Sequence, residues 1–272
     1  MALKDKKVGF IGSGAMAEAL LKGLLKAKIV NKTDIYSSDI NQDRLAQLKK
    51  EYGVKISKTN KELINSVDIV ILAVKPFIMG DILKDTGKEY KKGQLVISIA
   101  AGIPISFYES LLPHEVPVIR VMPNTPSLIG LGVSALALGK RAQTKDAKSA
   151  EEILYAVGKV VTVSESQMDG VTGLSGSGPA YIYLIIEALI DAGVRVGLPR
   201  DIATVLATQT LIGSAQMVVQ TGESPAKLKE MVTTPGGTTI AGLHKLEEGK
   251  LRATIMNAVV EATRRSEELG NK

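Results

Sequence analysis

Residues 7–17 read KVGFIGSGAMA, a short apolar run that leads directly into a glycine-rich turn. The apolar run is typical of a buried strand, and Gly12, Gly14 and Ala17 give the G-x-G-x-x-A form of a dinucleotide-binding turn. Gly12 permits the tight turn, Gly14 lets the backbone approach a pyrophosphate, and Ala17 lets the next helix lie close to the strand. The N-terminus of that helix would offer free N–H groups to the phosphates. The stretch therefore predicts a strand, a phosphate-binding turn and a helix.

Short β-branched runs go on alternating with longer segments of helical period as far as about residue 163. This alternation is typical of βαβ units around a mainly parallel sheet. Residues 68–74, DIVILAV, are apolar on both faces, as a central strand is. The predicted strands are 7–11, 34–38, 54–56, 68–74, 95–99, 118–121, 132–137 and 159–163.

Beyond residue 164 the strand pattern stops, and the chain reads as helices separated by Gly and Pro turns. The predicted helices are 178–196, 199–220, 225–231, 238–248 and 251–269. We therefore expect an α/β class fold, with an N-terminal domain at 1–164 and an all-α domain at 165–272. Several of these helices are apolar over more than one face. A domain made of only these five helices has little interior in which to bury such faces. Burial between subunits is the simplest interpretation, and a compact monomeric bundle is the alternative.

The composition excludes several chemistries. The chain has no Cys, no Trp and two His residues, which rules out disulfides and thiolate nucleophiles and leads us to expect no metal site. The 34 basic and 28 acidic residues leave a net charge of +6, but the lysines are scattered over predicted helix surfaces. With only 3 Phe and 7 Tyr for base stacking, we expect no nucleic-acid partner.

The sequence also bears on location. No uninterrupted apolar run reaches the roughly 18–20 residues that span a bilayer, so we expect no membrane partner. The first seven residues, MALKDKK, lack the apolar region of a secretory signal. Together with the absence of Cys, this favours a cytoplasmic protein.

The end of the second predicted strand, YSSD at residues 36–39, bears on the choice of dinucleotide. Asp39 would bind the ribose diol of NAD and repel a 2′-phosphate. Ser37 and Ser38 would instead donate hydrogen bonds to that phosphate, with Arg44 one turn further along. Ser38 and Asp39 are therefore candidate cofactor residues, and the sequence leaves NADPH and NADH both open.

Loops after the other strands should line the same crevice, because ligands of open α/β sheets bind beyond the carboxyl ends of the strands. These loops are Ala73–Pro76, Ala100–Gly102 and Met122–Pro126. For Lys75 and Asn124, the alternatives are an ordinary surface lysine and a turn asparagine.

Two segments of the second domain place glycines and hydroxyls just ahead of predicted helices. They are LSGSGPAY at 174–181 and VTTPGGTTI at 232–240. Free N–H groups and a positive dipole end converge there, which predicts anion sites without charged side chains. An ordinary N-cap with a glycine turn is the alternative for both segments, and it is the default interpretation of the first. A serine hydrolase elbow at Ser175 is a further alternative, but Ser177 stands where that motif needs glycine.

These segments together resemble the pyrroline-5-carboxylate reductase family in order and spacing, over essentially the whole chain. The matching segments are GFIGSGAM at 9–16, AVKP at 73–76, SIAAG at 98–102, RVMPNTP at 120–126, GLSGSGPAY at 173–181 and MVTTPGGTTI at 231–240. The resemblance implies reduction of 1-pyrroline-5-carboxylate to L-proline, the last step of proline biosynthesis, with NADP (NADPH) as the cofactor and NAD (NADH) possible. It also implies a Rossmann-like domain, a homodimer through C-terminal helices that assembles further, and an active site where the two domains meet.

The resemblance also implies roles for individual residues. The implied cofactor contacts are Gly12, Ser13, Gly14, Ala15, Met16, Asn60, Ala73, Val74, Lys75, Pro76, Ala100, Ala101 and Gly102. The implied substrate contacts are Glu165, Pro235, Gly236, Gly237 and Thr238, with Thr239 as the catalytic residue. Our hypothesis is that residues 236–238 hold the substrate carboxylate while the Thr239 hydroxyl hydrogen-bonds the ring nitrogen. A protonated cyclic imine already accepts hydride, so positioning would supply most of the catalysis.

Two departures and two alternatives accompany this resemblance. Asp39 stands where an NADPH enzyme is expected to have a phosphate-compatible residue, and Thr233 and Thr234 replace a serine-containing pair. A β-hydroxyacid dehydrogenase or related imine reductase would share the domain layout. The former would need a lysine that residues 178–196 lack. A non-catalytic dinucleotide sensor is the other alternative, although it need not keep the loop at residues 235–239.

Overall fold

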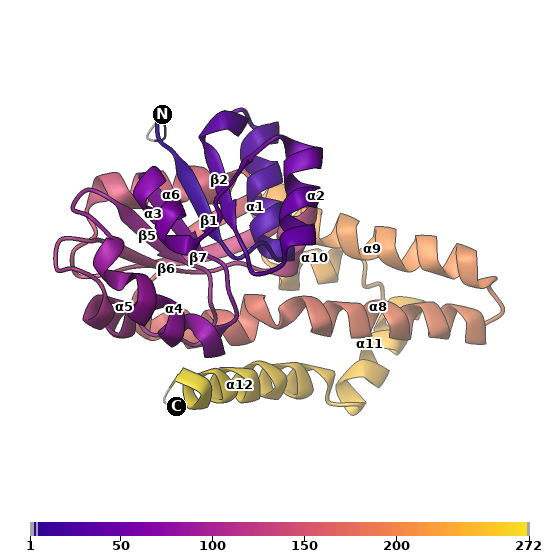
Figure 1. The fold of residues 1–272 in the computed structure, drawn as a ribbon. Coiled ribbons are helices and arrows are strands. Elements are labelled where there is room, and N and C mark those ends of the chain that lie inside the picture. Colours follow the sequence, from indigo (N-terminus) through magenta and orange to yellow (C-terminus); the bar gives the residue numbers. More distant parts are fainter. Residues whose placement is uncertain (1–2, 4, 271–272) are drawn as a thin grey trace. The chain divides into compact units, whose positions relative to one another are not determined.

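The computed structural model describes residue 3 and residues 5–270 (Figure 1). The chain forms two compact units. The sheet unit contains the residues up to Ser177 and those from Glu261 onward, and the helical unit contains Gly178–Val260. These units divide the chain at Ser177, and the domain boundary after residue 164 stays a prediction. Part of the N-terminal stretch on which we based the absence of a secretory signal lies outside the described residues.

The sheet unit is built on eight strands in the order β3-β2-β1-β4-β5-β6-β7-β8. Strands β1 to β6 run parallel, β7 is antiparallel to β6, and β8 is parallel to β7. Each predicted strand overlaps an observed one, and the mainly parallel sheet is confirmed. The strands are β1 (Val8–Ile11), β2 (Ile35–Ser38), β3 (Lys55–Ile56), β4 (Ile69–Leu72), β5 (Leu95–Ser98), β6 (Val118–Met122), β7 (Gly132–Leu138) and β8 (Gly158–Thr162).

Helices cover both faces of this sheet, which explains why its central strands are continuously apolar. Phe10 of β1 packs into one core cluster, whereas its neighbour Ile11 packs into the other, as side chains of a strand alternate. The first cluster receives α1 (Ala15–Lys26), α2 (Gln42–Tyr52) and α6 (Thr144–Tyr155). The second receives α3 (Asn60–Ser66), α4 (Met79–Thr86), α5 (Ile105–Leu111) and α7 (Met168–Val171).

The segment between α7 and α8 (Gly178–Arg195) corrects one prediction. Residues 172–176 form a π-helical turn, and the helical chain runs without interruption from Glu165 to Arg195. The Ser177 N–H donates to the Thr172 carbonyl at 2.8 Å instead of standing free. Helix α8 begins at Gly178 as predicted, but the anion site expected at residues 174–181 is wrong, because the helical chain preceding α8 leaves no free helix N-terminus there. Gly176 of this turn lies beside the Met122 side chain of β6, since a Cβ on it would be 2.6 Å from Met122 Cε.

The helical unit contains α8, α9 (Arg200–Thr221), α10 (Pro225–Met231), α11 (Thr238–Glu248) and the start of α12 (Leu251–Gly270). The five predicted helices are confirmed. Helices α8 and α9 pack closely where a Cβ on Gly193 would lie 2.8 Å from Ala203 Cβ. Within residues 178–260, all of which are described, Ala203 and Ala207 are the buried hydrophobic residues. The unit therefore has little core of its own.

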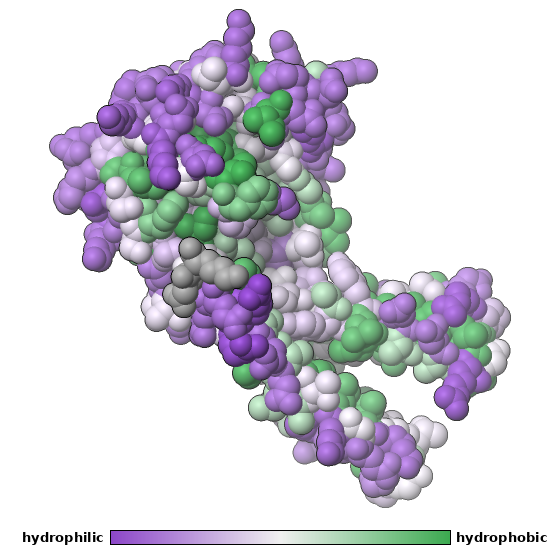
Figure 2. All heavy atoms as spheres, turned by 60° about the horizontal axis from the view of Figure 1, so that its bottom comes forward, coloured by the Kyte–Doolittle hydropathy of each residue, from purple (hydrophilic) through white to green (hydrophobic). Residues whose placement is uncertain are grey.

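Large apolar side chains instead lie on the surface of this unit (Figure 2, green). Leu184 of α8 is 67% exposed and Val219 of α9 is 74% exposed. By length and composition alone, Glu165–Arg195 and Arg200–Thr221 are long and apolar enough to cross a membrane. Sequence reasoning did not find these two segments, because it searched only for uninterrupted apolar runs.

Candidate active site

A cleft of ≈ 510 Å³ opens at the carboxyl ends of β1, β2, β4 and β5. It lies where the strand order reverses, since β2 and β4 flank β1 on opposite sides, and this is where open α/β sheets bind their ligands. The structure brings all but one of the predicted cofactor residues to this cleft. They are Gly12, Ser13, Gly14, Ala15, Met16, Ser38, Asp39, Asn60, Ala73, Val74, Lys75, Pro76, Ala100 and Ala101.

The glycine turn after β1 forms one wall of the cleft. Its two positions are glycine for different physical reasons. Gly12 has φ +95°, and a Cβ on it would lie 2.6 Å from the Ala73 carbonyl oxygen. The chain itself therefore requires glycine there. Gly14 has an ordinary extended backbone (φ −67°, ψ 179°), and a Cβ on it would have no neighbour within 4 Å. The space beside Gly14 is thus open to a ligand, directly at the N-terminus of α1.

Hydrogen bonds hold the polar side chains at the end of β2. The Asp39 carboxylate accepts from the Ser13 N–H at 2.6 Å and from the Asn41 N–H at 2.9 Å. Ser38 Oγ donates to Asn60 Oδ1 at 2.7 Å. Asn60, which only the family resemblance implied as a cofactor contact, therefore lies beside the end of β2. The sequence did not single out Ile40, which also lines the cleft and is 97% exposed.

Gly102 is the predicted cofactor residue that does not line this cleft. It lines an adjoining apolar pocket of ≈ 760 Å³, which shares Pro76 and Ala101 with the cleft and also contacts Phe77 and Phe107. The pocket continues from the coenzyme cleft within the sheet unit, so a ligand that fills the cleft can extend one end toward it.

Glu165 lies in the sheet unit, where its carboxylate is already partnered. It accepts the Ile105 N–H at 2.5 Å and lies 3.5 Å from the guanidinium of Arg120, a residue of β6 that is only 5% exposed. Arg120 also lies 3.8 Å from Asp169, which accepts a 2.6 Å hydrogen bond from Ser266 of α12. Sequence reasoning did not identify Arg120, although a charge inside an apolar strand was a signal for it.

The predicted substrate loop at residues 235–239 lies in the helical unit. The Gly237 N–H donates to the Thr234 carbonyl at 3.0 Å across Pro235 and Gly236, and Gly236 has φ +67°. This is a turn with Pro and Gly at the positions that a type II turn favours. It leads into the first turn of α11, whose N-cap Gly237 has no side chain to bind the free N–H groups.

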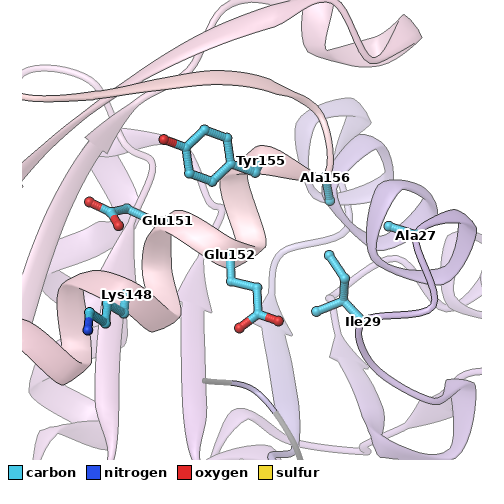
Figure 3. Close-up of a pocket in the computed structure, with 7 residues that line it drawn as sticks. All are labelled: Ala27, Ile29, Lys148, Glu151, Glu152, Tyr155 and Ala156. Carbon is cyan, nitrogen blue, oxygen red and sulfur yellow. The ribbon is translucent and has the colours of Figure 1, made fainter. Parts of the chain in front are cut away.

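Two other candidate features lie away from the cleft. Asn124 does not line it, which corrects the crevice prediction for Met122–Pro126, because the Asn124 side chain links the Val133 N–H (2.9 Å) to the Ser175 carbonyl (3.2 Å). A separate pocket of ≈ 390 Å³ lies beside α1 and α6. Lys148, Glu151 and Tyr155 are among the residues that line it (Figure 3). It shares no lining residue with the cleft. Across residues 3 and 5–270, no group of three or more Asp, Glu, His or Cys could hold a metal ion.

A doubly wound sheet with a glycine-lined cleft at its switch point is typical of dinucleotide-dependent oxidoreductases. Residues 7–102 match the family described as "NADP oxidoreductase coenzyme F420-dependent", and residues 165–269 match "Pyrroline-5-carboxylate reductase dimerisation". The chain belongs to the pyrroline-5-carboxylate reductase family, as its relatives show. The predicted NAD(P)-dependent oxidoreductase, with a Rossmann-like domain and a helical dimerisation segment, is confirmed.

The relatives cover nearly the whole chain. The pyrroline-5-carboxylate reductase of Methanosarcina acetivorans is 47% identical over 99% of this chain and 100% of its own, and that of Arabidopsis thaliana is 43% identical over 97% and 95%. The Coxiella burnetii reductase structure has a TM-score of 0.91 at 36% identity, covering 97% of this chain and 98% of its own. The Plasmodium falciparum reductase, solved with NADP bound, has a TM-score of 0.88 at 36% identity, with 98% of each chain covered.

Proposed function

We propose that this chain reduces 1-pyrroline-5-carboxylate to L-proline, the last step of proline biosynthesis, with NADPH or NADH as the hydride donor. Its family membership supports this proposal. The single observation that carries it within the chain is Gly14, where the backbone needs no glycine but the adjacent space is left open beside a helix N-terminus. A dinucleotide pyrophosphate is the group that such a space fits.

The decisive experiment follows the absorbance of NADPH and of NADH on addition of 1-pyrroline-5-carboxylate, with proline identified as the product. We expect oxidation of the coenzyme in equal amount to the proline formed. Oxidation of hydroxy acids in place of this reaction would indicate a β-hydroxyacid dehydrogenase. Coenzyme binding without any turnover would indicate a sensor.

In this proposal the chain's residues chiefly bind and orient the reactants. The predicted cofactor residues hold the dinucleotide, and the bound nicotinamide supplies the hydride. The turn at Pro235–Gly237, with Thr238, binds the substrate carboxylate through N–H groups at the start of α11. The Thr239 hydroxyl hydrogen-bonds the ring nitrogen, which keeps its proton as the neighbouring carbon receives hydride. We assign Glu165 to the substrate side of the site. Its carboxylate accepts a hydrogen bond from the Ile105 N–H, at the start of α5 and shortly after the Ala100–Gly102 loop.

Removing the Thr239 hydroxyl should slow the chemical step. We expect Thr239→Ala to lower kcat by about tenfold to a hundredfold, because a lost hydrogen bond to a charged group is worth roughly 1.5–3 kcal/mol. Thr239→Ser keeps the hydroxyl and should recover most of the rate. Steady-state kinetics, with coenzyme affinity measured separately, provide the test. Near-normal turnover of the alanine variant with intact coenzyme binding would refute the assigned role.

We also propose that the helical unit forms a homodimer through its apolar helices and that dimers assemble further. The exposed apolar faces of α8 and α9 support this, since side chains such as Leu184 and Val219 would be covered by a second copy. The domain division at residues 1–164 and 165–272 belongs to the same proposal, as do a cytoplasmic location and the absence of nucleic-acid and membrane partners.

A further inference from the structure

The loop between β5 and α5 carries an inference that rests on its proposed role in holding the coenzyme. Its two alanines line the coenzyme cleft, whereas Gly102 lines the adjoining apolar pocket. At the start of the loop, Ser98 Oγ accepts a hydrogen bond from the Ala100 N–H at 3.3 Å and pairs with the Tyr108 hydroxyl at 2.6 Å. Burial raises the pKa of Tyr108 to about 12, so this phenol keeps its proton and the pair persists at neutral pH.

The end of the loop is held by the Glu165 carboxylate, which accepts the Ile105 N–H at 2.5 Å. Between these two anchors, the C-terminal end of α12 lies against the loop. A Cβ on Gly102 would lie 3.7 Å from Leu269 Cβ, and a Cβ on Gly270 would lie 2.8 Å from the Gly102 carbonyl oxygen. The backbones are therefore too close for a side chain on Gly270. The position of the loop at Gly102 thus depends on where the end of α12 is seated.

A side-chain hydrogen bond fastens this end of the helix. Ser266 is 4% exposed, and its Oγ donates to the Asp169 carboxylate of α7 at 2.6 Å. Ser266 precedes Gly270 by about one helical turn, so the bond restrains the turn that contacts the loop. Asp169 is itself held 3.8 Å from the guanidinium of Arg120, which is buried. A hydroxyl bound to a carboxylate makes a stronger hydrogen bond than one between neutral groups, which gives α12 a firm anchor here.

We infer that Ser266 is a positioning residue for coenzyme binding, because its bond to Asp169 seats the end of α12 against the loop at Gly102. Ser266 lines the adjoining pocket and not the coenzyme cleft, so it acts on the coenzyme through the helix and the loop. Binding and seating are then thermodynamically linked. A seated helix favours bound coenzyme, and bound coenzyme favours the seated helix by the same factor.

Titration of NADPH into the full-length protein without pyrroline substrate tests this. Ser266→Ala should raise the Kd for NADPH about fivefold, which is the lower end of the range typical of coupling between separate sites. Ser266→Thr keeps the hydroxyl and should restore most of the affinity. Asp169→Ala should raise the Kd at least as much as Ser266→Ala. Combining the two substitutions should raise it no further, because both remove the same bond.

The matched control is Ser149→Ala, which removes a hydroxyl that donates to the Lys145 carbonyl within its own helix, α6. It should leave the Kd unchanged. Amide hydrogen exchange gives a readout that a purely structural role would not move. Bound NADPH should slow exchange in residues 262–270 of the wild type, and it should slow it much less in Ser266→Ala.

Wild-type affinity in Ser266→Ala, or exchange in residues 262–270 that does not respond to NADPH, would overturn the inference. A wild type that does not bind NADPH would refute the proposed coenzyme site along with it, whereas equally tight binding by every variant would refute the inference alone. Because these titrations need no turnover, failure to reduce 1-pyrroline-5-carboxylate would leave the measured Kd values intact.

Discussion

Gly14→Val is expected to abolish coenzyme binding while leaving the folded protein as stable as the wild type. The backbone at Gly14 has φ −67°, which any residue adopts, and a Cβ there meets no atom within 4 Å. The valine side chain would fill the space that the pyrophosphate needs at the N-terminus of α1. We expect the Kd for NADH or NADPH to rise by at least about a hundredfold, which corresponds to about 2.7 kcal/mol.

Two companion variants separate binding from folding. Gly12→Val should lose both coenzyme binding and stability of the fold. The left-handed φ of +95° and the Ala73 carbonyl, 2.6 Å from the new Cβ, would strain the loop itself. Gly170→Val places the same side chain in open space on α7, away from the cleft, and should change neither property. Thermal midpoints and coenzyme titrations distinguish the three proteins. A Gly14→Val protein that binds coenzyme normally would contradict the assignment of this turn to the pyrophosphate.

The sheet and the coenzyme cleft follow from local sequence rules. Alternating runs specify the strands, and a parallel order brings their carboxyl-terminal loops to one edge, so Gly12, Asp39 and Ala73 meet there although they are far apart in the chain. Asn60, too, reaches this edge through its bond to Ser38. The glycine at each position can be predicted from the motif, but the separate reasons for Gly12 and Gly14 emerge only from the surrounding atoms.

The features that sequence reasoning missed depend on partners distant in the chain. The π-helical turn before Gly178 reads as a loop because its glycines normally end helices, yet the backbone continues through it, with the Ser177 N–H donating to the Thr172 carbonyl. Asn124 is a plausible crevice residue until its bonds to Val133 and Ser175 are seen. Arg120 belongs to the same group, since its carboxylate partners, Glu165 and Asp169, lie more than 40 residues further along the chain.

Arg120→Met is expected to destabilise the sheet unit. The buried guanidinium lies 3.5 Å from Glu165 and 3.8 Å from Asp169, and these carboxylates bind the start of α5 and Ser266 of α12. Breaking a fully buried ion pair costs roughly 3–5 kcal/mol, and solvent screening of the partly exposed carboxylates reduces this to about 2 kcal/mol. The thermal midpoint should fall by about 4–8 °C.

The control for Arg120 is an ion pair that is shorter but exposed. Lys61 lies 2.8 Å from Asp85, with side chains 45% and 66% exposed. Lys61→Met should leave the midpoint unchanged within the error of the measurement, because water already screens that pair. Arg120→Lys should fall between the wild type and Arg120→Met, since one ammonium group cannot reach both carboxylates as a guanidinium does. An unchanged or raised midpoint in Arg120→Met would mean that water replaces the guanidinium at both carboxylates. The role of Arg120 would then be to position Glu165 and the start of α5. In that case the Kd for the coenzyme should be higher in the same variant.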